Sequence, residues 1–280
     1  MTIIKDKEFG GERPLYCCHG LELHGCTVHA GESAIKEGSQ ILAEGCTFEG
    51  KYPFWECDGV IIRDCTFTEG ARAALWYARN YIMEDCTVEA PKMFREMDGL
   101  SLRRIMIPNA AETLWSCRNV KVRELDVKNG DYIFMRCENL DIEGFRLLGN
   151  YSFQYCKNVE IRDSVLHTKD AFWQTENVIV YDSFINGEYL GWYSKNLRLV
   201  RCRIGGTQPL CYCENLVLED CLMESDADLA FEYSSVQATV QGHIVSVKNP
   251  RSGSIRAGSI GEIILDENIK APGDCKITVE

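Results

Sequence analysis

The sequence repeats itself about every twenty residues. Each copy begins at an anchor residue, and apolar residues follow at positions +1 and +3, a small or apolar residue at +6 and an apolar residue at +8. The anchors are Gly20, Gln40, Gly59, Asn80, Gly99, Asn119, Asn139, Asn158, Asn177, Asn196 and Asn215. The first and last anchors are 195 residues and ten steps apart, a mean period of 19.5. This period indicates a solenoid, whose repeats bury a shared core by stacking.

Within each copy the apolar positions alternate with polar ones, which predicts half-buried strands and no helix. The +6 and +8 columns, for example Cys65 with Phe67 and Cys202 with Ile204, are expected to point inward. Strands that stack on their own copy one coil later must be parallel and in register. The expected fold is therefore all-β, a parallel β-helix of about eleven to thirteen coils of 19–20 residues, with a rise of about 4.8 Å per coil.

The anchors are mostly Asn and Gly, the residue types that tolerate a left-handed backbone at a tight turn. Stacked Asn amides can also form hydrogen bonds from one coil to the next. We expect residues 1–19 to form an N-terminal cap strand, near Thr2 to Lys5, and a first turn. Residues 20–235 are predicted to form the regular coils. Residues 236–280, where the repeat loosens, are predicted to form degenerate coils and a C-terminal cap.

The charge and the apolar content of the chain indicate which partners and which cellular compartment to expect. The net charge of −12 and pI near 5.0 argue against a nucleic-acid partner and against an anionic membrane, because both would require a basic surface. The chain contains no run of eighteen apolar residues, and its first residues lack the apolar stretch of a signal peptide. We therefore expect a cytoplasmic protein.

Most of the fifteen cysteines fall into two columns, at +6 and at −2. Equivalent residues on adjacent coils carry Cβ atoms that run side by side, which is poor geometry for a disulfide. Small buried thiols that pack a narrow core are the expected outcome. The close pairs, Cys17 with Cys18 and Cys211 with Cys213, lack two further ligand clusters at zinc spacing. We expect no metal and no cofactor.

The segment before each anchor carries the functional interest. The column at −5 is apolar and is expected to face the core, whereas the column at −4 mixes Lys36, Arg95 and Gln154 with all five tryptophans and is expected to face out. Tyrosines recur at −7 and at −3. Rings among charged and amide groups suit a sugar chain. The candidate ligand-binding residues are Trp55, Trp76, Arg95, Trp115, Tyr132, Tyr151, Gln154, Trp173, Tyr189 and Trp192.

Three other interpretations of these rings stay open. They could stack on one another beneath a tail of the chain, they could form a homodimer interface, or the −4 column could be buried as plain core.

A column of acids at +5 offers candidate acid–base chemistry. Asp163 and Asp182 occupy equivalent places on adjacent coils and should lie about 5 Å apart, near the separation of a glycosidase pair. They are the candidate catalytic residues. The ordinary explanation is a salt-bridged face of turn residues, because Asp favours turns and arginines stand nearby.

Nearly the whole chain resembles a family of bacterial proteins that is described as a domain of unknown function within the pectin-lyase-like superfamily. The segments that carry the resemblance are FGGERPLY, YPFW, ARAALWY, APKMFRE, GDYIFM, YSFQY, KDAFW, GEYLGWYSKNL, GTQPLCYC and SIGEIILDEN. The resemblance implies a right-handed, single-stranded β-helix, in a superfamily rich in polysaccharide lyases and hydrolases. Fold kinship carries no activity by itself.

The expected function is recognition of an oligosaccharide or another sugar-containing ligand on the aromatic face. The alternatives are a scaffold that self-assembles through the same face, and a cytoplasmic polysaccharide lyase or glycoside hydrolase.

Overall fold

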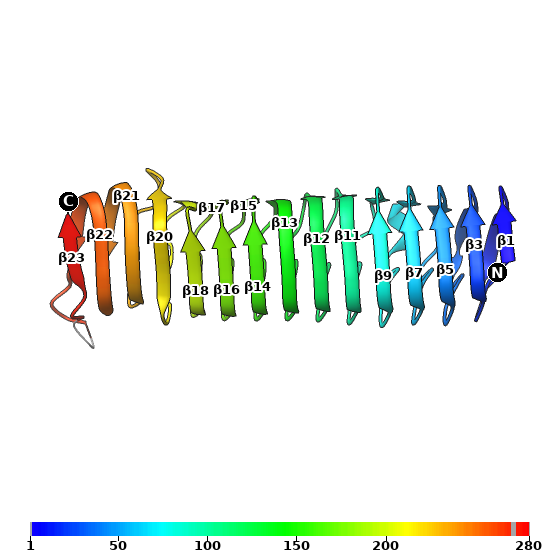
Figure 1. Cartoon of the computed structure of the whole chain (residues 1–280), viewed down its shortest axis with the longest axis horizontal. Helices are drawn as coiled ribbons and strands as arrows, with labels where there is room; N and C mark the ends of the chain where they lie inside the picture. The colour runs from blue at the N-terminus through cyan, green and yellow to red at the C-terminus, as the bar shows by residue number, and fades with distance from the viewer. Residues whose placement is uncertain (1, 270–272, 280) are drawn as a thin grey trace. The chain divides into compact units, whose positions relative to one another are not determined.

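The computed structural model describes residues 2–269 and 273–279. By their contacts the residues form two compact units, unit 1 (residues 1–146) and unit 2 (residues 147–280). Each unit is built of parallel strands that stack coil upon coil, and Figure 1 shows these strands side by side within each unit. The predicted fold, an all-β right-handed parallel β-helix, is confirmed, with about 14 turns instead of eleven to thirteen.

Unit 1 contains one short 3₁₀ turn, η1 (Glu69–Ala71), and β13 (Glu138–Leu148) crosses the boundary at residue 146. The other strands of unit 1 are β1 (Thr2–Lys5), β2 (Glu8–Glu12), β3 (His19–His24), β4 (Thr27–Glu32), β5 (Ser39–Glu44), β6 (Thr47–Phe48), β7 (Asp58–Arg63), β8 (Thr66–Phe67), β9 (Arg79–Glu84), β10 (Thr87–Val88), β11 (Asp98–Ile107) and β12 (Arg118–Val127).

The strands of unit 2 are β14 (Lys157–Arg162), β15 (Val165–His167), β16 (Glu176–Tyr181), β17 (Phe184–Asn186), β18 (Lys195–Val200), β19 (Arg203–Gly205), β20 (Leu216–Met223), β21 (Ser235–Lys248), β22 (Ser252–Ile264) and β23 (Lys276–Val279). No helix in the described ranges is long and apolar enough to cross a membrane.

The period of the sequence repeat sets the register in which strands of neighbouring coils pair. In unit 1, Leu21 of β3 pairs with Ile41 of β5, and in unit 2, Val178 of β16 pairs with Leu197 of β18. Equivalent side chains therefore stack inside the coils. The rings of Phe153 and Phe172, for example, are fully buried and lie 5.4 Å apart at an angle of 19°. Such continuous ladders form the core and exclude water from it.

Every anchor adopts a left-handed backbone, as the sequence predicts, with φ between 53° and 77°. In unit 2 the anchor amides form a continuous ladder. The Nδ2 of Asn177 donates to Asn158, that of Asn196 to Asn177, and that of Asn215 to Asn196, at distances of 2.9–3.2 Å. Asn thus fits both demands of the turn, the backbone conformation and the hydrogen bond to the coil before it.

None of the fifteen cysteines, all of which lie in the described residues, forms a disulfide, and twelve of them are buried. In the +6 column the thiol also makes hydrogen bonds. Cys46 Sγ donates to the Glu44 carbonyl at 3.3 Å, and the Cys46 N–H donates to Cys65 Sγ on the next coil at 3.3 Å. Ser164 and Ser183 form the same pattern in unit 2 with hydroxyls. Where the column carries Cys or Ser, the side chain therefore both donates and accepts, whereas Ile105, Leu125 and Phe145 fill the same column by apolar packing alone.

The first strand and the last coils differ in regularity. Strand β1, at the predicted position, pairs with β3 on one side. After the last anchor, β21 and β22 still pair in parallel, but the coil is shorter, since Ser235 pairs with Ser252 seventeen residues on. The expected degenerate coils are thus continuous β-helix with a changed period. The expected C-terminal cap lies partly outside the described residues, at 270–272 and 280.

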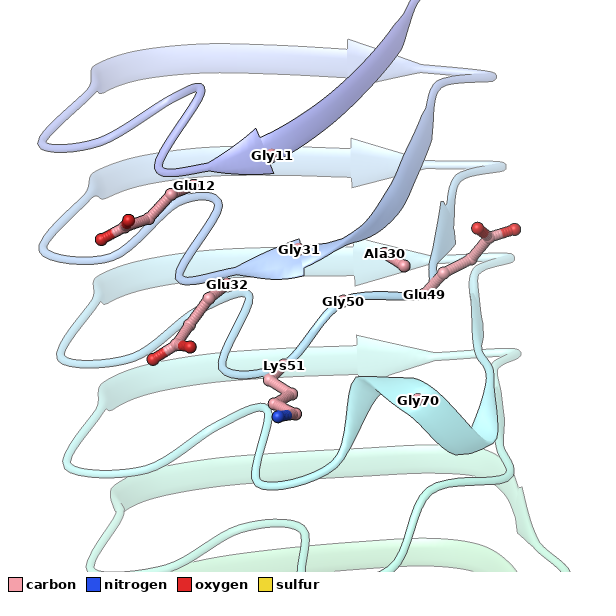
Figure 2. Close-up of a pocket in the computed structure, with 9 residues that line it drawn as sticks. All are labelled: Gly11, Glu12, Ala30, Gly31, Glu32, Glu49, Gly50, Lys51 and Gly70. Atoms are coloured by element: carbon pink, nitrogen blue, oxygen red, sulfur yellow. The ribbon is translucent and has the colours of Figure 1, made fainter.

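A column of glycines in unit 1 leaves a shallow groove of about 530 Å³ along the coils. Figure 2 shows Gly11, Gly31, Gly50 and Gly70 on successive coils, with Glu12, Glu32 and Lys51 along one side. A Cβ on Gly31 would lie 2.1 Å from the Gly11 carbonyl oxygen. The close approach of neighbouring backbones therefore requires glycine at positions 31, 50 and 70.

Candidate functional site

The residues just before each anchor form a third side of the coil, between two strands. At −5 the side chains from Ile35 onward are in the core as predicted, with Phe54 and Leu210 fully buried, whereas Leu15 of the first coil is half-buried. At −4 all five tryptophans are half-buried and none belongs to the fully enclosed core. We call the surface formed by the side chains at −7, −4 and −3 the aromatic face.

Backbone geometry fixes this division of side chains. The residue at −3 is left-handed in each coil that carries a ring on this face, for example Tyr77 and Tyr193 with φ of 57°. Its N–H donates to the carbonyl of the −4 residue one coil later, as from Gln174 to Trp192 at 2.9 Å. The turn therefore has its own hydrogen-bonded register, which holds the rings of successive coils one above the other.

In unit 1 most contacts of the aromatic face come from its own residues, although the buried Nε of Arg95 has no hydrogen-bond partner among the described residues. The Arg95 guanidinium lies between two indoles, 4.7 Å from Trp76 and 4.2 Å from Trp115, and it pairs with Glu112 at 2.9 Å. The Trp76 indole N–H donates to the Lys92 carbonyl, and that of Trp115 donates to the Tyr132 carbonyl. Trp55 stacks 5.2 Å from Trp76. These contacts make this part of the face a closed cation–π stack.

In unit 2 the rings stack, but their polar atoms are not paired in the same way. Trp173 and Trp192 lie 5.8 Å apart at 21°, and Tyr189 lies 5.5 Å from Trp192. Unlike Trp76 and Trp115, these two indole nitrogens are buried without a hydrogen-bond partner, as is the side-chain nitrogen of the buried Gln154. Tyr151 lies under the Lys169 ammonium, 5.4 Å from its ring centre. Part of the hydrogen-bonding capacity of unit 2 is therefore unused.

The ring ladder of unit 2 continues past the predicted residues. Tyr193 lies 5.9 Å from Trp192, Tyr212 lies 5.1 Å from Tyr193, and Tyr233 lies 5.2 Å from Tyr212. The rings of Trp192 and Tyr193 are nearly parallel, at 13°, whereas the two tyrosine pairs that follow are tilted by 38° and 39°. A free ring face is therefore expected where the ladder stops and leaves room for another planar group.

An open cavity of about 660 Å³ lies at this place. Its walls are Tyr193, Tyr212, Cys213, Glu214, Tyr233, Arg251, Asn268 and Ile269. The tyrosine backbones are fixed from within, because the Ser234 hydroxyl accepts from the Cys213 N–H at 2.8 Å and donates to the Leu210 carbonyl at 2.7 Å.

The opposite wall is fixed by a pair of hydrogen bonds between Asn249 and Asp266. The Asn249 amide donates to the Asp266 carboxylate at 2.8 Å, and its oxygen accepts from the Asp266 N–H at 2.9 Å. This pair holds the chain that leads to Asn268. The N–H of Arg251 donates to the Ser234 carbonyl, and its own carbonyl accepts from the Asp274 N–H. The cavity is therefore built on anchored backbone.

The cavity carries one acidic and one basic side chain. Glu214 forms an ion pair with Lys195 at 3.6 Å. Arg251 is exposed, and the structure of the described residues gives its guanidinium no ion pair. Burial raises the pKa of the Tyr212 hydroxyl, which keeps it protonated and able to donate a hydrogen bond. The cavity thus offers ring surface, hydroxyl groups and an unpaired cation.

The predicted acids at +5 are all left-handed turn residues, including Asp163 and Asp182 with φ of 48° and 47°. Asp182 accepts two hydrogen bonds of 2.7 Å from Arg201, and this pairing lowers the pKa of its carboxyl. Asp85 and Arg104 form the same pair in unit 1. The pairing favours a role for Asp182 in the turn, and the catalytic assignment of Asp163 and Asp182 stays a prediction.

The buried thiols differ in acidity. A hydrogen bond with the thiol of the next coil lowers the pKa of Cys46 and of Cys202. Burial raises the pKa of Cys57 and of Cys211 to about 12, which is unsuitable for a nucleophile or a metal ligand. No group of three or more His, Cys, Asp or Glu side chains within residues 2–269 and 273–279 is arranged to hold a metal ion.

Sequence reasoning found the ring columns but missed this cavity. Tyr193 and Tyr212 belong to the −3 tyrosine column, which was a usable signal. Arg251 and Asn268 come from coils in which the period changes, so no column could align them with the tyrosines.

No curated protein matches the sequence. A crystal structure of a double mutant of the periplasmic alginate epimerase AlgG is similar over 99% of this chain and 74% of its own, at 10% identity and a TM-score of 0.27. The family described as "Protein of unknown function (DUF3737)" matches residues 2–278. The chain, which this family covers almost from end to end, is a member of the DUF3737 family.

Proposed function

We propose that this chain recognises a carbohydrate, and that the cavity beside Tyr193, Tyr212 and Tyr233 receives one of its sugar rings. The observation that carries the proposal is the composition of the cavity, three tyrosines with a few polar groups around a volume of about 660 Å³. A pyranose presents an apolar C–H face and a rim of hydroxyls. Such a ligand fits aromatic walls that carry a few placed donors and acceptors.

The aromatic face of unit 2 gives the ligand room to extend. From the cavity, the ladder continues over Trp192 to Trp173 at about the spacing of the coils. Trp173 and Trp192 are half-buried, and Tyr193 is 48% exposed. A sugar chain that lies along the exposed parts of these rings would cover apolar surface that a soluble protein seldom leaves bare.

Calorimetric titration of the whole protein tests this proposal. The probes are cellohexaose, xylohexaose and maltohexaose, which share a length and differ in linkage and substituents. We expect at least one of them to bind, and Tyr233→Ala to weaken it about tenfold, because an aromatic platform contributes on the order of 1 kcal/mol. The matched control is Tyr77→Ala, an exposed ring on the ladder of unit 1. Equal losses in both variants would count against the cavity.

A second candidate is self-association through the same face. It is favoured by the exposure of Tyr77 and Tyr193, which are 43% and 48% exposed on otherwise stacked ladders. Sedimentation velocity over a wide range of protein concentrations separates the two candidates. A concentration-dependent dimer that Tyr193→Glu dissociates supports an interface, and a strict monomer removes it.

A further inference from the structure

Arg251 distinguishes the cavity from the remainder of the aromatic face. Among the described residues, Lys195 pairs with Glu214 at 3.6 Å and Lys248 pairs with Glu232 at 3.0 Å. Arg251 lines the cavity without such a pair among the residues that the structure describes. Its backbone is anchored on both sides, through Ser234 and Asp274, so its guanidinium extends from a fixed point.

A guanidinium presents parallel N–H groups that match a carboxylate or a phosphate in a bidentate arrangement. The tyrosines that share the cavity supply ring surface and, through Tyr212, a protonated hydroxyl. The Asn268 side chain adds an amide to the same wall. A ligand with an anionic group on its ring can contact the tyrosine rings and pair with Arg251 at the same time. A neutral ring can contact only the tyrosines.

Glu214 is the one carboxylate among the described residues that line the cavity, and it does not cancel the preference for an anion. Glu214 is held by Lys195, which offsets its charge. The chain as a whole carries a net charge of −12, so general attraction of anions to this protein is unfavourable. Binding of an anion here therefore has to come from a local arrangement.

We propose that the cavity is a subsite for an oxyanion carried on the ligand's ring, with Arg251 as the residue that determines this specificity. The carboxylate of a sugar acid and the phosphate of a sugar ester share the required chemistry. The inference rests on the proposed carbohydrate recognition for the identity of the ring, and on Arg251 for the anion.

Ligand-observed NMR titrations with four matched probes test the inference on the whole protein. The probes are glucose, glucuronate, glucose 6-phosphate and inorganic phosphate. We expect glucuronate or glucose 6-phosphate to bind about tenfold more tightly than glucose. The reason is that a charge-assisted hydrogen bond to Arg251 is stronger than a hydrogen bond between neutral groups. Which of the two binds identifies the source of the oxyanion.

The variant Arg251→Gln should remove that preference, so that glucuronate and glucose 6-phosphate bind no more tightly than glucose. The control Arg198→Gln removes a cation that is paired with Glu219 outside the cavity, and it should change none of the four titrations. If all three sugars bind the natural sequence equally, the anion subsite is wrong and the carbohydrate proposal stands. If inorganic phosphate binds as tightly as glucose 6-phosphate and Arg251→Gln abolishes both, the anion subsite stands and the carbohydrate proposal fails.

Discussion

The indole rings of Trp173 and Trp192 lie 5.8 Å apart on consecutive coils of unit 2, at an angle of 21°. Each ring covers a face of its neighbour, so the ladder presents edges along its length. The open ring surface is instead found with Tyr193, Tyr212 and Tyr233, which line the cavity. The candidate site is therefore centred on the three tyrosines at the end of the ladder and not on the tryptophans.

The +6 column predicts that serine can replace a buried cysteine there. Cys46→Ser keeps a donor and an acceptor, as Ser164 and Ser183 do, and should leave the melting temperature nearly unchanged. Cys46→Ala removes the bond to the Glu44 carbonyl and leaves a small void, and should cost about 1–2 kcal/mol. Thermal and urea unfolding measure both, with Cys17→Ser at an exposed thiol as the control. Equal losses for Ser and Ala at position 46 would contradict the hydrogen-bond account.

The amide ladder predicts an order of stability at Asn196, whose φ is 55°. Asn196→Gly loses the bonds to Asn177 and from Asn215 but keeps an easy left-handed turn. Asn196→Ala loses the bonds and also strains the backbone by roughly 1–2 kcal/mol. Urea unfolding should therefore rank the natural residue first, Gly second and Ala last. The backbone argument fails if Ala is as stable as Gly.

The glycine groove predicts a steric effect at Gly31. Gly31→Ala places a Cβ 2.1 Å from the Gly11 carbonyl oxygen, so the first coils have to separate and the variant should unfold at a lower temperature. Gly10→Ala is the matched control, because its Cβ would meet its nearest atom, His29 Cβ, at an ordinary 3.8 Å. An unchanged melting temperature in Gly31→Ala would show that the backbone contact is not tight.

The burial of Asp170, a residue of the aromatic face, predicts that the stability of the fold depends on pH. It is buried, and burial raises the pKa of its carboxyl. A raised pKa in the folded state means that folding favours the protonated form. The stability contribution of this group is therefore complete below the unfolded pKa near 3.8 and is lost as the pH rises through the folded pKa. Asp170→Asn should match the natural protein at low pH and melt at a higher temperature at pH 7.5. Melting curves in which Asn is no better at pH 7.5 would contradict this.

The sequence predicts the fold well because one local pattern repeats. Anchors, inward columns and left-handed turns follow from residue types that recur at fixed spacing, as at Asn196 and Cys46. The candidate site is less predictable because it depends on where the pattern ends. Arg251 and Asn268 reach the cavity from coils of changed length, and only coordinates bring them beside Tyr212.

Solving crystal structures of the protein soaked with its tightest oligosaccharide is the most direct test of the central claim. The account predicts a sugar ring in the cavity against Tyr212 and Tyr233, with the chain leaving over Trp192. A ligand bound only elsewhere, for example in the glycine groove at Gly31, with the cavity empty, would contradict it.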